Sequence, residues 1–277
     1  MEKPFYGIRR ITAELHQKGY KVNHKRVRRL RKATGLSPAS VQHFGTSSGS
    51  RSVSVSSEGS EDDAAPFGEL KKGDAMVYLK PFYEELRAKG VEVLDLSGAF
   101  EKSEKPVYCK QDAHWNPEGI KLAVDELVKL MKLDKGDKKF EMEDQKISII
   151  GDLMLSLDKE AKPSEEITLH TVKGDVFADA SPVLLLGDSH TLIFSSGGDM
   201  LAEKSGLGEN LAAALGMPVE RIAVKGSAAA AVRTNLYRKA AKDAAWIKGK
   251  KFVIWCFSAR EFTESTSGWP KVPVMKK

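Results

Sequence analysis

Apolar positions in the larger, C-terminal part of the chain follow two patterns, helical spacing and short continuous runs. Helical spacing is found at 75–89, 117–131, 207–215 and 230–246. The second of these segments also has a helix start signal, because Asn116 is a suitable N-cap and Pro117 occupies the first helical position. These four segments are predicted helices.

Short apolar runs between the predicted helices indicate strands. They cover 91–96, 183–186, 221–224 and 252–256. The run from Val183 to Leu186 is unbroken, which is the pattern of a parallel strand covered on both faces of its sheet. Alternation of helices and strands predicts an α/β fold with a three-layer α/β/α arrangement around a parallel sheet.

The N-terminal part of the chain has a separate helical pattern. Its apolar positions are Ile8, Ile11, Leu15, Val22, Val27 and Leu30. Gly19 is a natural end for a first helix and Asn23 a reasonable N-cap for a second. This pattern predicts a small helix-turn-helix segment.

Charge separates the two parts. Residues 1–45 carry 11 basic and two acidic side chains, a net charge of +9, whereas the other 232 residues carry 33 basic and 36 acidic ones. Between them lies a stretch rich in serine, glycine and acidic residues, which is typical of a flexible linker. The predicted organisation is therefore a helix-turn-helix segment at 1–44, a linker at 45–66 and an α/β domain at 67–277.

Composition excludes several classes of protein. With 41% apolar and 30% charged residues, the chain is neither collagen-like nor wholly disordered. No apolar run approaches the ~20 residues of a membrane span, and the first residues do not have the pattern of a secretory signal. We therefore expect the chain, as written, to stay in the cytoplasm.

The two cysteines, Cys109 and Cys256, lie far apart and outside any metal-ligand spacing. We expect both to be small buried side chains, with no disulfide framework, metal or cofactor.

The basic N-terminal segment is suited to phosphate contacts. Its second predicted helix would present six cations, Lys25, Arg26, Arg28, Arg29, Arg31 and Lys32. The amino-acid sequence from Tyr6 to Leu36 closely resembles the small helical region that precedes the catalytic core of insertion-sequence transposases. No transposase core follows, so two interpretations stay open: a relic of an insertion event or mis-set start codon, and a working module that binds nucleic acid through residues 1–44.

Candidate chemistry lies at two motifs. Gly187-Asp188-Ser189-His190 follows the apolar strand and would deliver Ser189 as a nucleophile at the carboxyl edge of the sheet, although Gly-Asp-Ser is also ordinary turn chemistry. Asp112-Ala113-His114 precedes a helix, and Asp112 there can hold the imidazole Nδ1–H and leave Nε2 free to take a serine proton. The alternative is a helix N-cap beside a half-buried histidine.

Together the two motifs resemble the SGNH-hydrolase-like domain of the alginate O-acetyltransferase family (AlgX/AlgJ type), in which an Asp-x-His-Trp motif precedes a Gly-Asp-Ser motif. The resemblance spans roughly residues 76–265 and includes Ile150-Gly151-Asp152-Leu153. It implies Ser189 as nucleophile, His114 as general base and acid, and Asp112 as its orienting group. An acetyl group would pass through Ser189 to a hydroxyl of an extracellular, alginate-like polysaccharide.

Several further residues are candidates for binding the oxyanion or the substrate. The Ser189 N–H and the loop with Gly226 and Ser227 would supply oxyanion donors, although Gly226 is equally interpretable as a turn glycine. Arg233 would stabilise the oxyanion or bind an anionic sugar, or else be an ordinary exposed helical arginine. Trp115 would form a sugar-stacking wall or pack beneath the histidine loop. We expect Asp188 to hold the turn through backbone N–H groups.

Two departures from the family pattern stand out. His190 follows Ser189 and would compete with His114 as the base. The transposase-like segment and linker also occupy the place of the family's export signal and upstream strands, which predicts a truncated sheet with an open edge.

The resemblance further implies a periplasmic location for the family, and an acetyl donor supplied by a membrane O-acyltransferase. A plain esterase with the same triad and a non-catalytic fusion that binds DNA are the alternative functions.

Overall fold

The computed structural model describes residues 79–226, 229–258, 261 and 269–274, together with the backbone of three short strands further upstream. The upstream strands are β1 (Ala39–Val41), β2 (Arg51–Val53) and β3 (Val55–Ser57). The helices of the described part are α3 (Leu79–Ala88), α4 (Ser97–Glu101), α5 (Pro117–Met131), α6 (Asp152–Leu157), α7 (Ser189–Leu192), α8 (Leu207–Leu215), α9 (Ala231–Lys242) and α10 (Ala244–Lys248). Its strands are β4 (Leu94–Asp95), β5 (Met142–Ile149), β6 (Glu165–Val172), β7 (Val183–Gly187), β8 (Glu220–Ala223) and β9 (Phe252–Ser258).

The central sheet has the order β4-β3-β1-β9-β7-β8, and β2 also pairs with β9. Strand β7 lies between β8 and β9 and is parallel to both, with Leu185 opposite Arg221 and Ile254. The β1 strand runs antiparallel to β9. The predicted parallel sheet is thus confirmed for the three neighbouring strands β8, β7 and β9, while the antiparallel β1 makes the whole sheet mixed.

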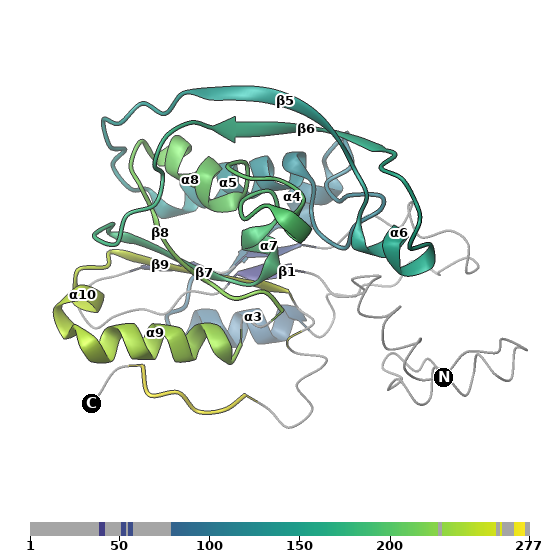
Figure 1. The fold of residues 1–277 in the computed structure, drawn as a ribbon. Helices are drawn as coiled ribbons and strands as arrows, with labels where there is room; N and C mark the ends of the chain where they lie inside the picture. Colours follow the sequence, from purple (N-terminus) through teal and green to yellow (C-terminus); the bar gives the residue numbers. More distant parts are fainter. Residues whose placement is uncertain are drawn as a thin grey trace, which may run out of the picture.

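Side chains of the central strands alternate between two cores, which establishes the three layers. Val183 and Leu185 of β7 belong to the cluster that includes α5 and α8, whereas Leu184 and Leu186 belong to the cluster that includes α9 and α10. All four are fully buried. The helices accordingly cover opposite faces of the sheet (Figure 1). The α/β/α prediction is confirmed, and the unbroken apolar run follows from burial on both faces.

A two-stranded hairpin lies outside the three layers. Strands β5 and β6 pair antiparallel with each other, with Ile147 opposite Ile167, and α6 lies in the connection between them. Figure 1 shows this hairpin above α5 and α8, on the side away from the central sheet. Leu169 and Val172 of β6 join the same core as α5. Sequence analysis did not predict this hairpin.

Most predicted elements agree with the observed ones. Helix α5 spans the predicted residues, and the Asn116 side chain accepts a hydrogen bond from Gly119 N at 3.0 Å as its N-cap. The predicted helix 230–246 is divided, because Asp243 lies outside the helical region and its carboxylate caps α10 through Ala245 N and Trp246 N. The predicted strand 91–96 is reduced to Leu94–Asp95.

Some residues of the segment predicted as a linker pair with the central sheet, while the division of the chain into three segments stays a prediction. Six residues of that segment form β2 and β3, which pair with β9 and β4. Between residues 52 and 56, valine alternates with serine, the period-two pattern of a strand, and that pattern prevails over the linker-like composition. Strands β1 and β2 both pair with β9, and the truncation of the sheet stays a prediction. The predicted helix-turn-helix segment lies outside the described residues, apart from the backbone of β1.

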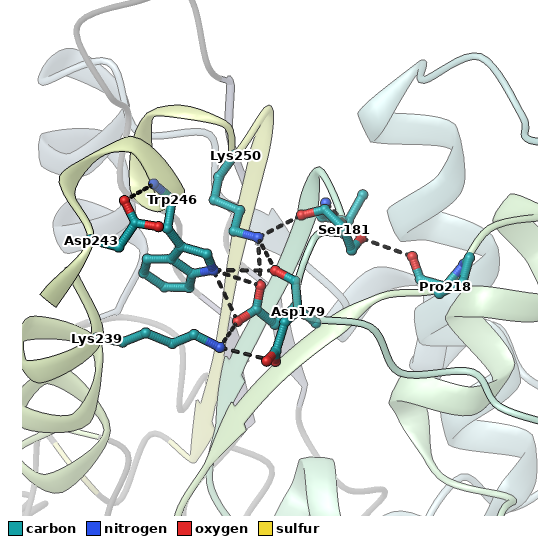
Figure 2. A network of polar contacts seen from close by, with 9 residues as sticks. Asp179, Ser181, Pro218, Lys239, Asp243, Trp246 and Lys250 are labelled. Carbon is teal, nitrogen blue, oxygen red and sulfur yellow. Dashed lines mark hydrogen bonds and ion pairs between the residues drawn. The ribbon is translucent and has the colours of Figure 1, made fainter.

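A buried polar network joins the starts of the central strands (Figure 2). Glu220, the first residue of β8, is 2% exposed and accepts hydrogen bonds from Lys250 Nζ at 2.5 Å and Trp246 Nε1 at 2.9 Å. Lys250 also donates to the carbonyl oxygens of Asp179 and Ser181, which precede β7. Because burial of a charge is costly unless it is paired, these contacts hold the three strands in register at their amino ends.

Replacement of Glu220 by alanine should destabilise the domain strongly. The change leaves the Lys250 ammonium buried without its carboxylate, and loss of one partner of a buried pair costs about 3 to 5 kcal/mol. Chemical denaturation of both proteins would measure this difference. The control is Glu85→Ala, which removes the exposed Glu85–Lys89 pair and should leave the denaturation midpoint unchanged. Equal midpoints for Glu220→Ala and the unaltered protein would contradict a stabilising role for the network.

Candidate functional site

The nucleophile turn lies at the carboxyl end of β7. Asp188 is the N-cap of α7, and its Oδ1 accepts a hydrogen bond from His190 N at 2.8 Å. Its Oδ2 accepts from Ser258 N, at the end of β9, at 2.9 Å. Asp188 is fully buried, so this carboxylate fixes the turn to the neighbouring strand. The predicted turn-holding role of Asp188 is confirmed, and Ser189 is delivered as the first residue of α7.

Close packing explains the glycine before Asp188. A Cβ atom on Gly187 would lie 2.2 Å from Cγ2 of Thr191, a contact that no side chain can make. Thr191 is held there because its hydroxyl donates to the Asp188 carbonyl at 2.7 Å. Gly187 thus lets the one-turn helix α7 fold back over the end of its own strand.

Asp112 and His114 form a buried pair on the loop before α5. His114 Nδ1 lies 2.5 Å from Asp112 Oδ1, and the same oxygen accepts a hydrogen bond from His114 N at 3.0 Å. Asp112 is 4% exposed and His114 8% exposed. With Nδ1 held by the carboxylate, Nε2 is the ring nitrogen left for proton transfer.

The charged form of Asp112 is favoured by these contacts. Burial acts to raise the pKa of its carboxyl, but the hydrogen bond and charge of His114 and the N–H groups of Asp152 and His114 outweigh burial and lower that pKa. Asp112 is therefore a carboxylate at neutral pH, as an orienting group beside an imidazole must be.

The N-cap alternative for Asp112 is wrong for α5, whose cap is Asn116. Asp112 instead accepts a hydrogen bond from Asp152 N, the first N–H group of α6, at 3.0 Å. This contact joins the loop of the candidate base to the segment between β5 and β6, 40 residues further along the chain.

The two motifs meet at one place. The rings of His114 and His190 lie 4.8 Å apart between centroids, and His190 directly follows Ser189. Trp115 Nε1 donates to the His190 carbonyl at 2.9 Å, a second link between the loops. The fold thus brings together segments that are 75 residues apart in sequence. The hydrogen bond between Ser189 and His114, and with it the triad, stays a prediction.

Trp115 does not form a sugar-stacking wall. The residue has no exposed surface, and its ring makes an edge contact with His190 at 5.7 Å between centroids. A sugar ring has no access to it, so the prediction of a substrate contact is wrong. Trp115 packs beneath the histidine loop, which was the other interpretation.

Contacts of Arg233 favour a structural role. Its guanidinium donates to the Ala229 carbonyl and, at 2.9 Å, to the Pro270 carbonyl. It also lies over the Trp269 ring, 5.5 Å from the centroid. These contacts hold the C-terminal segment 269–274 against α9. A role for Arg233 toward an oxyanion or an anionic sugar stays a prediction.

The candidate oxyanion loop is described in part. Gly226 has a φ of +76°, is exposed, and has open space around the position of a Cβ. Val224 N donates to the Gly187 carbonyl at 2.9 Å, so this loop leaves the sheet beside the nucleophile turn. The conformation suits a turn glycine, and the oxyanion role of Gly226 stays a prediction. Ser227 lies outside the described residues.

His190 also lies close to a carboxylate, that of Asp188. Its Nδ1 lies 3.4 Å from Asp188 Oδ1, and the His190 ring is as buried as that of His114. Two histidines, each with a neighbouring aspartate, thus lie next to each other, and their competition for the role of base stays a prediction.

Two carboxylates that were not assigned from the sequence hold the base loop. Asp152 Oδ1 accepts a hydrogen bond from Ala113 N at 2.9 Å, and the Glu165 carboxylate accepts from Lys110 N and Gln111 N at 2.8 Å each. Glu165 begins β6 and Asp152 begins α6, so both belong to the β5–β6 hairpin and its connection, residues 142–172, called the hairpin insertion below. The family resemblance includes Asp152 without giving it a role, whereas Glu165 would have been indicated only by a prediction of the hairpin.

Both cysteines are buried, as expected, and burial raises the pKa of each thiol well above its ordinary value. Within the described residues, no group of histidine, cysteine, aspartate and glutamate side chains is arranged to hold a metal ion. None of the helices in that part of the chain is long and apolar enough to cross a membrane.

Comparison with known proteins gives matches to two families. The family described as "SGNH hydrolase-like domain, acetyltransferase AlgX" matches residues 64–259, more than half of the chain. A family described as an HTH-like domain matches residues 1–43. No curated protein matches the chain.

Among solved structures, the O-acetyltransferase domain of Pseudomonas putida AlgJ is similar in fold. It has a TM-score of 0.57 and 19% sequence identity, over 79% of this chain and 78% of that one. Pseudomonas aeruginosa AlgX has a TM-score of 0.44 and 18% identity, over 57% of this chain and 38% of that one. The expected order of motifs, the α/β/α fold and the family match agree: the chain belongs to the family of AlgX-type, SGNH-hydrolase-like acetyltransferase domains.

Proposed function

We propose that the domain is a serine-dependent O-acetyltransferase that places acetyl groups on hydroxyls of an alginate-like polysaccharide. The observation that carries this proposal is the buried Asp112–His114 pair, whose imidazole lies against the residue that follows Ser189. Membership of the acetyltransferase family and the fold shared with the AlgJ domain support the class of reaction.

In the first half of the proposed reaction, Ser189 Oγ attacks the carbonyl carbon of the acetyl donor. His114 Nε2 takes the hydroxyl proton, and Asp112 stabilises the imidazolium that forms. Collapse of the tetrahedral intermediate breaks the bond to the donor's leaving group, which receives the proton from His114. The product is acetyl-Ser189. The Ser189 N–H group, at the start of α7, is the nearest backbone candidate to bind the oxyanion.

In the second half, a sugar hydroxyl attacks the acetyl-Ser189 carbonyl. His114 takes the proton of this hydroxyl and returns it to Ser189 Oγ as the ester bond to the enzyme breaks. If water attacks in place of the sugar, the same steps release acetate, and the protein is an esterase. The two functions share every residue of the proposed triad and differ in the acceptor.

The proposal is tested with p-nitrophenyl acetate in the presence and absence of an alginate-like oligosaccharide. Acetylated oligosaccharide, detected by mass spectrometry, supports transfer, whereas release of acetate alone supports hydrolysis. Ser189→Ala should lower either activity by at least about 10³-fold and leave the fold intact, because only the hydroxyl is lost. Unchanged turnover by this variant, with an unchanged circular dichroism spectrum, would remove Ser189 as the nucleophile.

The identity of the base is tested by comparing the two histidines. His114→Ala should abolish activity as completely as Ser189→Ala does, whereas His190→Ala should cost less than about tenfold, the effect of a neighbour that transfers no proton. Asp112→Asn should lower kcat by about 10²- to 10⁴-fold, since the amide favours the wrong tautomer of His114. A greater loss with His190→Ala than with His114→Ala would assign the base to the Asp188–His190 pair.

A second candidate function belongs to the N-terminal segment. The HTH-like match over residues 1–43 and the net charge of +9 over residues 1–45 favour binding to nucleic acid. A gel shift with nonspecific duplex DNA should show binding at low salt that weakens steeply between 50 and 200 mM salt, the range over which phosphate contacts lose about 10³- to 10⁵-fold in affinity. The control is the full chain with Arg26, Arg28, Arg29 and Arg31 replaced by glutamine, which lowers the positive charge and keeps residues 39–57. No shift at low salt would exclude this function.

A further inference from the structure

Asp152 makes two contacts with the loop that carries the candidate base. Its backbone N–H donates to Asp112 Oδ2 at 3.0 Å, and its own carboxylate accepts a hydrogen bond from Ala113 N at 2.9 Å. The first contact occupies the Asp112 oxygen that does not face His114 Nδ1. The second fixes the residue between Asp112 and His114. Both members of the pair are therefore oriented from the same residue of α6.

Gly151 permits this approach. A Cβ atom at that position would lie 2.0 Å from the Gln111 carbonyl oxygen and 2.5 Å from the Asp112 Cβ. The carbonyl oxygen of Gln111 also accepts hydrogen bonds from Leu153 N and Met154 N. Because the first N–H groups of a helix lack partners within the helix, the base loop caps α6 while α6 orients the base loop.

Negative charge accumulates at this contact. The pKa of Asp152 is raised, mainly because its carboxyl group is partly withdrawn from solvent and secondly because of the negative charge of Asp112. The residue as a whole is exposed. Asp112, Asp152 and His190 are the titratable groups beside His114, and Glu165 and the Cys109 thiol lie further along the same loop. Asp152 therefore brings a second carboxyl group to the loop that carries the Asp112–His114 pair.

We infer that Asp152 is a positioning residue of the reaction, which sets the orientation of His114 through its contacts with Asp112 and Ala113. This inference rests on the proposed function for its role in turnover. The contacts themselves exist in the folded protein whether or not acetyl transfer is its reaction.

Two substitutions separate orientation from charge. Asp152→Asn keeps a carbonyl oxygen to accept the Ala113 N–H but removes the negative charge. Asp152→Ala removes both. The backbone N–H to Asp112 is retained in each variant. Glu165→Gln makes the same change of charge at the outer half of the loop, and Asp158→Asn makes it at the exposed end of the connection after α6.

The first measurement does not depend on activity. Imidazole signals of the full chain are followed by NMR, and the His114 signal is assigned by its absence in His114→Gln. The His114 ring signals should shift in Asp152→Ala, because the loop that carries the imidazole loses the carboxylate that accepts from Ala113 N. They should not change in Asp158→Asn. Unchanged His114 signals in Asp152→Ala would overturn the positioning role of Asp152.

The second measurement is steady-state kinetics. Asp152→Ala should lower kcat by about 10- to 100-fold, the loss typical of a residue that orients a functional group, and KM should change little. Asp152→Asn should recover most of this loss, because its amide oxygen can still accept the hydrogen bond from Ala113 N. Equal kcat in Asp152→Ala and the unaltered protein would overturn the positioning role.

The experiments distinguish failure of the proposed function from failure of the inference about Asp152. If Ser189→Ala and His114→Ala keep full activity, the triad is wrong, yet the NMR signals of His114 still report whether Asp152 orients that residue. If the triad variants are inactive and both Asp152 variants behave as the unaltered protein, only the inference about Asp152 is wrong.

Discussion

The structure depends on buried carboxylates that accept hydrogen bonds from backbone N–H groups. Asp188 and Asp112 are almost completely withdrawn from solvent, and each compensates for lost hydration by accepting hydrogen bonds from the backbone of two segments. Asp188 joins the nucleophile turn to the end of β9, and Asp112 joins the base loop to the start of α6. Because an unpaired buried charge is so costly, these contacts leave the loops little freedom to separate.

The amino ends of strands β7, β8 and β9 carry a structural network, whereas the candidate site lies at the carboxyl ends. At the amino ends, Glu220 and Lys250 form a buried pair, and its further contacts are to carbonyl oxygens, an indole N–H and the Lys239 ammonium, which is the environment of a structural pair. At the carboxyl ends, Ser189, His114 and His190 are each about one-tenth exposed and so lie close to solvent. A fixed amino end provides the rigid support that a site built on loops requires.

The hairpin insertion gives the candidate site a second support. Its core residues pack on α5 and its carboxylates hold the loop that leads into α5, so the same helix is approached from two directions. The base loop is consequently ordered by residues between 40 and 55 positions further along the chain. Such dependence on a separate element means that changes far from the nucleophile can alter the orientation of His114.

The sequence by itself determined the layers and the position of the motifs. Continuous apolar residues from Val183 to Leu186 require burial on both sides, so the three-layer sheet follows from hydrophobicity alone, and Asn116-Pro117 specifies the start of α5 through local capping. The placement of Ser189 at the end of a strand follows from the same local reasoning.

Only the tertiary structure decided which groups lie around these motifs. Burial of Trp115 is the sum of contacts with distant segments, and no local pattern distinguishes it from an exposed aromatic wall. The strands at residues 51–57 form because β9 and β4 offer partners, and Asp152 reaches Asp112 because the hairpin folds back over α5 and α8. Capping and burial of strands are local or one-dimensional properties that a sequence displays directly. Contacts between segments depend on how the whole chain packs.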